Sequence, residues 1–155
     1  MPLLEVTDLR TYFSTDAGVA RAVDGVSLQV GVGETLGIVG ESGCGKTVTA
    51  LSVLRLIPSP PGEIVAGSSI RFEDEELLEI EPGRLREIRG NEISMIFQEP
   101  MTALNPVFTV AQQIGEVLRI HQGLNRKAAR RKSLELLQKV HIPDPNARLD
   151  SYPHE

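Results

Sequence analysis

Residues 40–47 carry the sequence feature that most constrains the fold of this chain. Their sequence, Gly-Glu-Ser-Gly-Cys-Gly-Lys-Thr, matches the pattern G-x-x-x-x-G-K-[ST] of a phosphate-binding loop, which joins a strand to a helix. The flanks agree with that context, because residues 35–39 are typical of a buried strand and residues 48–57 of an apolar helix. We therefore predict a strand, a phosphate-binding loop and a helix in this order.

The residue types of this loop suit the binding of a nucleoside triphosphate with Mg²⁺. Glycine lets the backbone curl so that successive N–H groups point into one concavity, where the positive end of the following helix also attracts phosphate. Lys46 adds a full positive charge, and the hydroxyl of Thr47 is placed to bind Mg²⁺. The alternative, a glycine-rich turn without a ligand, is disfavoured because every fixed position of the pattern is met. The predicted cofactor-binding residues of the loop are Gly40, Glu41, Ser42, Gly43, Cys44, Gly45, Lys46 and Thr47.

The composition narrows the classes of protein to which the chain can belong. With 155 residues, 41% of them hydrophobic, it is long enough for one domain with a core. Its net charge of −5 argues against a dedicated nucleic-acid-binding protein. It has no apolar run of transmembrane length, no recognisable secretion signal and a single cysteine. These features favour a protein of the reducing cytosol.

The patterns around the loop predict further strands. Residues 3–13 are typical of one strand, and Val26, Leu28 and Val30 alternate with polar residues as in a second strand with one buried face. We expect these two strands to form an antiparallel pair. Further along the chain, the patterns predict strands at residues 69–72 and 93–97 and a short helix at residues 82–89.

The last third of the chain is predicted to be a small helical lobe. Apolar residues recur there at helical spacing in two segments, and Asn125 is placed to cap the second helix. The apolar faces hold Val110, Ile114, Val117 and Leu118 in the first helix, and Ala129, Ser133, Leu136, Leu137 and Val140 in the second. Basic residues cluster on the polar side of the second helix, where a solvated surface is favoured over a nucleic-acid site. They are Arg126, Lys127, Arg130, Arg131 and Lys132.

Gln98, at the end of the predicted strand 93–97, is a further candidate site residue. Its amide oxygen could contact Mg²⁺ or the attacking water, and the loop that follows could link the state of the nucleotide to the helical lobe. From its position alone, a glutamine that only forms a hydrogen bond at a strand end is an equal alternative.

Several segments together resemble the ATP-binding subunits of ABC transporters, and within them those of dipeptide and oligopeptide or nickel importers. The segments are residues 22–27 (Ala-Val-Asp-Gly-Val-Ser), the loop at 40–47, residues 97–106 (Phe-Gln-Glu-Pro-Met-Thr-Ala-Leu-Asn-Pro), residues 142–145 (Ile-Pro-Asp-Pro) and residues 152–155 (Tyr-Pro-His-Glu). The resemblance covers the whole chain. It implies an α/β fold of the P-loop NTPase class, an incomplete ABC-type nucleotide-binding domain with an antiparallel β subdomain. Residues 1–98 would form the β-rich core and residues 99–155 the start of the helical lobe.

The resemblance also implies roles for single residues and a set of partners. Phe13 matches the aromatic residue that stacks on adenine, with Tyr12 as the alternative, and Gln98 matches the glutamine that contacts Mg²⁺. ATP and Mg²⁺ would be the ligands. The implied partners are permease subunits that dock on the helical lobe, a second ATP-binding subunit and, indirectly, a substrate-binding protein. The protein would lie on the cytoplasmic face of the cell membrane and power peptide uptake. Import of nickel or an opine remains an alternative, and an ATPase of DNA repair or translation is a less favoured one.

The catalytic motifs that complete this family do not occur in the 155 residues. They are the Leu-Ser-Gly-Gly signature, the second carboxylate motif with its catalytic glutamate, and the switch histidine, so no catalytic residue is assigned. We expect an N-terminal fragment that binds ATP–Mg²⁺ weakly without useful hydrolysis, because phosphoryl transfer needs a group that positions the water. A non-catalytic nucleotide-binding module is the alternative. We also expect exposed apolar segments in the core, because the strands that should flank the loop strand would be absent.

Overall fold

The computed structural model describes residues 2–99 and 104–155, and the chain divides into two compact units, Met1–Arg86 and Glu87–Glu155. The first unit contains the β-strands and the phosphate-binding loop. The second contains the helices that begin at Val110 and beyond. The predicted boundary between a core and a helical lobe, after residue 98, stays a prediction.

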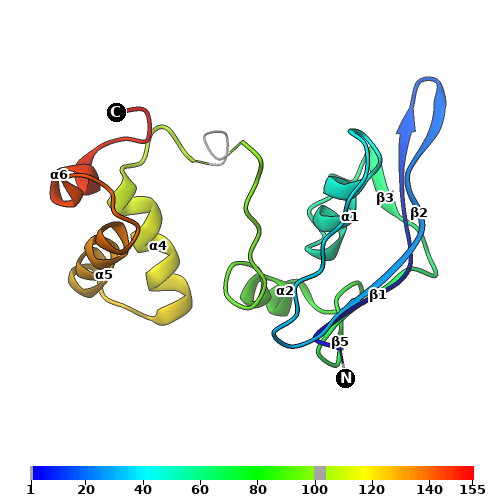
Figure 1. Ribbon diagram of the computed structural model, residues 1–155, viewed down its shortest axis with the longest axis horizontal. Coiled ribbons are helices and arrows are strands. Elements are labelled where there is room, and N and C mark those ends of the chain that lie inside the picture. The colour runs from blue at the N-terminus through cyan, green and yellow to red at the C-terminus, as the bar shows by residue number, and fades with distance from the viewer. Residues whose placement is uncertain (1, 100–103) are drawn as a thin grey trace. The chain divides into compact units, whose positions relative to one another are not determined.

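Two strands, β1 (Leu4–Thr15) and β2 (Gly18–Val30), form a long antiparallel hairpin, which Figure 1 shows in blue. A turn at residues 16–17 joins them, so the predicted antiparallel pair is confirmed. Val6 and Leu9 of β1 are buried in the core. The predicted buried face of β2 is buried only in part, because Val26 is 36% exposed.

The register of the hairpin shifts at three places, between Val6 and Leu9, between Leu9 and Arg10, and between Thr11 and Tyr12. At the last of these, β2 has an extra residue. Thr11 of β1 lies opposite Val23, whereas the next residue, Tyr12, lies opposite Arg21. Ala22 is therefore left without a partner in β1, which makes it a β-bulge. A bulge of this kind bends its strand locally and redirects the neighbouring side chains.

The central strand of the sheet is β1. It pairs with β2 along one edge, and β3 (Gly62–Ile64) and β4 (Ser69–Phe72) pair with different parts of its other edge. A short strand, β5 (Glu75–Glu76), pairs with β4. The strand predicted at residues 69–72 is thus confirmed, and so, with an end one residue earlier, is the predicted short helix, here α2 (Pro82–Ile88).

The helix after the phosphate-binding loop, α1 (Lys46–Val53), forms but ends before the predicted residue 57. Arg55 has a φ of +50°, a left-handed conformation that an α-helix cannot continue through. Ser52 of α1 is fully buried, and its Oγ lies 2.9 Å from Oγ1 of Thr11 in β1. The helix therefore packs on the face of β1 that carries Thr11.

Two predicted strands, residues 35–39 and 93–97, are wrong, because neither segment forms a strand. A strand needs a neighbour for its backbone N–H and C=O groups. Within residues 2–99 and 104–155, the only pairing of either segment is an isolated bridge between Arg89 and Ile93. The apolar side chains are consequently exposed, as expected: Leu36 by 42%, Ile38 by 49%, Val39 by 93%, Ile96 by 93% and Phe97 by 41%.

The second unit is helical, as predicted. It contains α4 (Val110–Gln122), α5 (Arg126–Lys139) and the short α6 (Pro145–Asp150), which Figure 1 shows in yellow, orange and red. The side chain of Asn125 accepts a hydrogen bond from the N–H of Ala128, so the predicted cap is confirmed. The core of this unit includes Leu118, Ala129, Ser133, Leu137 and Leu149, whereas the predicted core residues Val117 and Val140 are 50% and 65% exposed.

The basic residues of α5 lie on its exposed side, as predicted. Arg130 forms a bidentate ion pair with Asp150, with both N–O distances at 2.7 Å, and Lys132 lies 3.3 Å from a carboxylate oxygen of Glu135. In the part of the chain that the structure describes, no helix has the length and apolar character needed to cross a lipid bilayer.

Candidate functional site

The phosphate-binding loop (residues 40–47) depends on two glycines in the left-handed region. Gly43 has a φ of +83° and Gly45 a φ of +92°, which residues with a Cβ atom rarely adopt. A Cβ atom on Gly45 would also collide with the carbonyl oxygen of Ala22. The loop is therefore packed directly against the backbone of β2, at the bulge.

Lys46 folds back onto the loop. Its ammonium nitrogen donates hydrogen bonds to the carbonyl oxygens of Gly40 (2.9 Å) and Glu41 (2.7 Å), and it lies 3.5 Å from Sγ of Cys44. These contacts keep the positive charge at the loop. They can be exchanged for phosphate oxygens, because an anionic acceptor binds an ammonium group more strongly than a neutral carbonyl does.

The beginning of α1 supplies backbone donors. No residue that the structure describes accepts a hydrogen bond from the N–H groups of Gly45, Lys46 or Thr47. Thr49 is the first residue of the helix whose N–H has a partner, the carbonyl oxygen of Gly45 at 2.8 Å. Free N–H groups at the positive end of a helix attract an anion such as phosphate.

The structure places all eight predicted loop residues in one surface segment. Gly45 and Lys46 are half-buried, and the other six are exposed, including Thr47 with its hydroxyl. In the described ranges, no group of three or more His, Cys, Asp or Glu side chains gathers to hold a metal ion. The exposed hydroxyl of Thr47 is an oxygen donor of the kind that Mg²⁺ accepts.

Gln98 belongs to the second compact unit, whereas the phosphate-binding loop belongs to the first. Gln98 is exposed and follows a segment that is not a strand. Its contact with Mg²⁺ stays a prediction. Of the sequence block 97–106 that carries it, residues 100–103 lie outside the described residues.

Tyr12 and Phe13 lie on opposite faces of β1, because successive residues of a strand point to opposite sides. Phe13 shares its face with Thr11, whose hydroxyl contacts Ser52 of α1. The ring of Phe13 lies beside Gly62, where an added Cβ atom would come within 2.8 Å of Cε1. Phe13 is half-buried.

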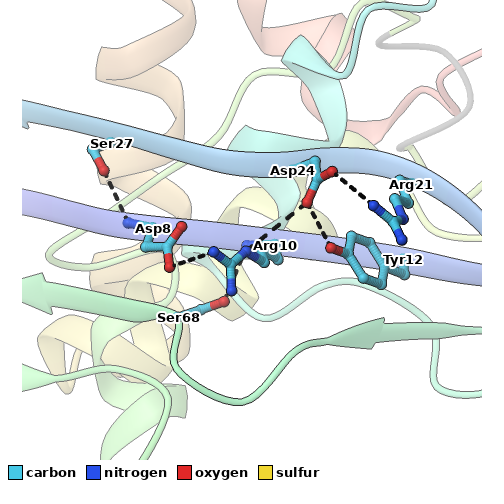
Figure 2. A network of polar contacts seen from close by, with 7 residues as sticks. All are labelled: Asp8, Arg10, Tyr12, Arg21, Asp24, Ser27 and Ser68. Carbon is cyan, nitrogen blue, oxygen red and sulfur yellow. Dashed lines mark hydrogen bonds and ion pairs between the residues drawn. The ribbon is translucent and has the colours of Figure 1, made fainter.

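Tyr12, Arg21 and Asp24 form a cluster on the opposite face of the hairpin, which we name the tyrosine clasp (Figure 2). The hydroxyl of Tyr12 donates to Oδ1 of Asp24 at 2.6 Å, and the guanidinium carbon of Arg21 lies 5.5 Å from the centre of the Tyr12 ring. Arg21 also lies 3.4 Å from Oδ2 of Asp24. Arg10 approaches the same carboxylate at 3.9 Å.

The hydrogen bond between Tyr12 and Asp24 changes the acidity of both groups. It is the main cause that holds the pKa of the Asp24 carboxyl below its ordinary value, and the nearby Arg21 acts in the same direction. The same bond is the main cause that raises the pKa of the Tyr12 hydroxyl. The bond therefore favours a protonated phenol beside an ionised carboxylate.

The sequence patterns give Tyr12 as the alternative to Phe13 and include Asp24 in the segment 22–27 that carries the resemblance, but they assign no role to Asp24 and do not single out Arg21. One signal is available, since Asp24 lies opposite the basic residue Arg10 in the paired strands. To predict the contact from this signal, one must know the register of the hairpin, and the register shifts at the bulge.

Comparison with known proteins adds an independent finding. Residues 23–155 match the family described as ABC transporter. A protein of Sinorhizobium fredii, named as a peptide ABC transporter ATP-binding protein, is 53% identical over 153 residues, which is 99% of this chain and 45% of the relative. A protein of Brucella abortus, named as a peptide import ATP-binding protein, is 50% identical over 153 residues, 99% of this chain and 46% of the relative. The chain thus spans about half the length of these relatives.

Two solved structures share the fold. One is described as a dimeric bacterial ABC transporter cassette, with a TM-score of 0.81 and 18% sequence identity. The other is described as a dimeric ATP-binding cassette in a post-hydrolysis state bound to ADP and Pi, with a TM-score of 0.78 and 16% identity. In both cases the likeness covers 97% of this chain and 62% of the solved chain.

Proposed function

The chain belongs to the ABC transporter family, and from this premise we propose that it is the N-terminal part of an ATP-binding subunit that powers peptide import. The family resemblance and the predicted ABC-type fold are confirmed by the matching family and by the two solved structures. Peptide as the cargo is supported by the names of the two relatives. No comparable support exists among these relatives for nickel or an opine.

The geometry of the phosphate-binding loop is the observation that carries the proposal. We propose that the triphosphate of ATP takes over the hydrogen bonds that Lys46 now gives to Gly40 and Glu41, and accepts others from the free N–H groups at the start of α1. Thr47 would hold Mg²⁺ through its hydroxyl. When bound, ATP–Mg²⁺ supplies the phosphoanhydride bond whose cleavage drives transport.

Phe13 is proposed to stack on the adenine ring. One observation supports this role over Tyr12: Phe13 is on the face of β1 that packs against α1. Tyr12 faces the other way, with its hydroxyl bonded to Asp24. A flat aromatic ring suits a base because both have π-faces that stack at little loss of hydration.

We propose that this chain binds ATP without hydrolysing it at a useful rate. Attack on the γ-phosphate requires a group that orients or deprotonates water. The sequence contains no match to the carboxylate motif that supplies this group in the family. Gln98 would contact Mg²⁺ and report the state of the nucleotide to the helical unit, but it would not act as the base.

The proposed partners follow from the transporter family. The helical unit would dock on a permease subunit, and a second ATP-binding subunit would close over the nucleotide. The dimeric state of the two solved relatives supports the second contact. In this role the protein would lie in the cytoplasm at the inner face of the membrane, and a substrate-binding protein would be connected to it only through the permease.

Calorimetric titration of the purified chain with ATP in the presence of Mg²⁺ tests the proposal, with Lys46→Ala as the variant. We expect saturable binding that weakens by at least about tenfold in Lys46→Ala, because the variant loses a charge-assisted contact to phosphate. The matched control is Lys127→Ala, which removes an exposed lysine of α5 and should bind as the parent does. Phosphate release, followed on the same samples, should stay at background.

Two outcomes would contradict the proposal. A folded chain that shows no binding would exclude ATP as the ligand of this loop in the chain. Steady phosphate release that disappears in Lys46→Ala would overturn the absence of hydrolysis.

A further inference from the structure

The tyrosine clasp bridges the bulge at Ala22. Arg21 precedes the bulged residue and Asp24 follows it by two positions, while Tyr12 reaches across from β1 to bind both. Figure 2 shows the three side chains meeting over the two neighbouring strands. The contacts therefore fix how far the two ends of the bulge stand apart and how β1 lies beside them.

The bulge also supports the phosphate-binding loop. The carbonyl oxygen of Ala22 lies so close to Gly45 that any Cβ atom there would collide with it. This contact is made by the backbone of Ala22, and no side chain of the clasp takes part in it. The clasp acts on the hairpin at the point where the hairpin touches the loop.

Phe13 is the neighbour of Tyr12 in β1, and the two rings are on opposite faces of the strand. Twisting β1 at Tyr12 would redirect Phe13, because both side chains are attached to the same stretch of backbone. A strand next to a bulge is prone to such twisting, since the ladder of hydrogen bonds is interrupted there.

We propose that the tyrosine clasp positions Phe13 relative to the phosphate-binding loop, and that Tyr12 and Asp24 are therefore positioning residues for the adenine base of ATP. The inference rests on the proposed function, because it takes Phe13 as the base-stacking residue. The clasp does not touch the nucleotide itself. Its effect reaches the base through Phe13 and leaves the contacts of Lys46 with phosphate in place.

The test compares ATP with inorganic tripolyphosphate, which offers the same phosphates without a base. Both are titrated in the presence of Mg²⁺ against the full chain and its Tyr12→Phe and Asp24→Asn variants. Tyr12→Phe keeps the aromatic ring beside Arg21 and removes only the hydroxyl that binds Asp24. We expect ATP to bind about three- to tenfold more weakly to each variant, a part of the full stacking contribution. Tripolyphosphate should bind to each within about twofold of the parent, because the loop contacts are unchanged.

The matched control is Gln29→Ala. Gln29 donates to Oε1 of Glu5 at 2.8 Å, which is another exposed cross-strand contact of the same hairpin, away from the bulge. Gln29→Ala removes a cross-strand contact of the hairpin without touching the clasp. It should therefore leave the binding of both ATP and tripolyphosphate unchanged. Phe13→Ala is the positive control and should lose the preference for ATP over tripolyphosphate.

A spectroscopic measurement separates stacking from affinity. Etheno-ATP, which carries a fluorescent adenine analogue, should be quenched on binding to the parent chain and quenched less at saturation in Tyr12→Phe. Thermal unfolding followed by circular dichroism checks that each variant is folded. The quenching of bound etheno-ATP at saturation would not change if the clasp only contributed to stability.

Each result decides the inference. Tyr12→Phe and Asp24→Asn that keep the full preference for ATP and the full quenching would overturn it. Equal binding of ATP and tripolyphosphate by the parent chain would also overturn it, while leaving phosphate binding by the loop intact. Failure of the folded parent to bind either ligand would overturn the proposed function and this inference with it.

Discussion

The two flanks of the phosphate-binding loop are held in very different ways. On one side, α1 packs on β1, with Ser52 fully buried against Thr11. On the other side, residues 35–39 form no strand, and Val39 is 93% exposed. A helix closes its backbone hydrogen bonds within itself, whereas a strand needs another segment of the fold to pair with. The loop in this chain is therefore supported from its helical side and from the bulge of β2.

The largest expected effect on the free energy of unfolding comes from replacing a glycine at the helical side of the loop. A glycine in the exposed flank, residues 35–39, serves as the comparison. Gly45→Ala should destabilise the chain by about 3 kcal/mol, because it combines a strained positive φ with a collision against a backbone carbonyl. Gly37→Ala, in the exposed flank, has no atom within 4 Å of the added Cβ and should change stability by less than about 0.5 kcal/mol. Urea unfolding followed by circular dichroism measures both. Equal effects of the two exchanges would show that the flanks are supported alike.

The contact between α1 and β1 should give the next largest effect. The Ser52 hydroxyl donates its single hydrogen to the carbonyl oxygen of Val48 at 2.7 Å, so the hydroxyl of Thr11 is the donor in the 2.9 Å contact between them. Ser52→Ala would leave a buried Thr11 donor without its acceptor and should cost about 1–2 kcal/mol. Thr11→Val removes the donor and should cost less, about 0.5–1 kcal/mol. The same unfolding assay applies, and a larger loss in Thr11→Val than in Ser52→Ala would contradict this assignment of donor and acceptor.

The success of sequence-based prediction follows the same division. The β1–β2 hairpin, α2 and the Asn125 cap depend on nearby residues, and their patterns identify them, whereas β4 is predicted correctly although it pairs with the distant residues 4–7. The strands predicted at 35–39 and 93–97 are apolar enough to be buried, but apolar character does not provide a pairing partner. The tyrosine clasp escapes prediction for another reason, since it forms only after the bulge has shifted the register.

For the candidate site, the sequence predicts the residues of the loop and the choice between two aromatic residues. The structure adds the faces of β1 on which Tyr12 and Phe13 lie, which a pattern with two adjacent aromatic residues cannot distinguish. Gln98 remains a prediction from resemblance. Its contact with a nucleotide depends on how two compact units come together, and neither unit determines that by itself.

A smaller effect is expected from the exposed flank. Val39→Ser should change the free energy of unfolding by less than about 0.5 kcal/mol, because the side chain makes little contact in the folded chain. It should, however, reduce self-association, since Leu36, Ile38 and Val39 together expose apolar surface. Sedimentation velocity over a range of concentrations measures this. Unchanged self-association, or a clear loss of stability, would mean that residues 35–39 are covered after all.

The smallest expected effect is a pH dependence of the free energy of unfolding, which comes from Tyr12 and Asp24 of the tyrosine clasp. The pKa of Asp24 is lowered from its ordinary value of 3.8, chiefly by the hydrogen bond from Tyr12, so its contribution to stability is present above that value. The contribution is lost as the pH falls through the lowered pKa of the folded state. The pKa of Tyr12 is raised from 10.0, chiefly by the same bond, so its contribution is present below that value and is lost as the pH rises through the raised pKa.

Asp24→Asn should remove this dependence at the acid end. Unfolding measured between about pH 2 and pH 5 should show parent and variant converging as the pH falls below the ordinary pKa of an aspartate. Asp16→Asn, in the turn of the same hairpin, serves as the control. A difference between parent and Asp24→Asn that stays constant over this range would contradict the role of the carboxylate charge.

Amide hydrogen exchange of the chain, measured with and without ATP–Mg²⁺, tests the central claim most directly because it reports on both flanks at once. We expect residues 35–39 to exchange rapidly in the free chain and the later residues of α1 to exchange slowly. On addition of ATP–Mg²⁺, the N–H groups of Gly45, Lys46 and Thr47 should become protected, and Lys46→Ala should abolish much of that change. Slow exchange of residues 35–39 in the free chain, or no added protection of the loop with nucleotide, would contradict a loop that is held from its helical side and binds phosphate there.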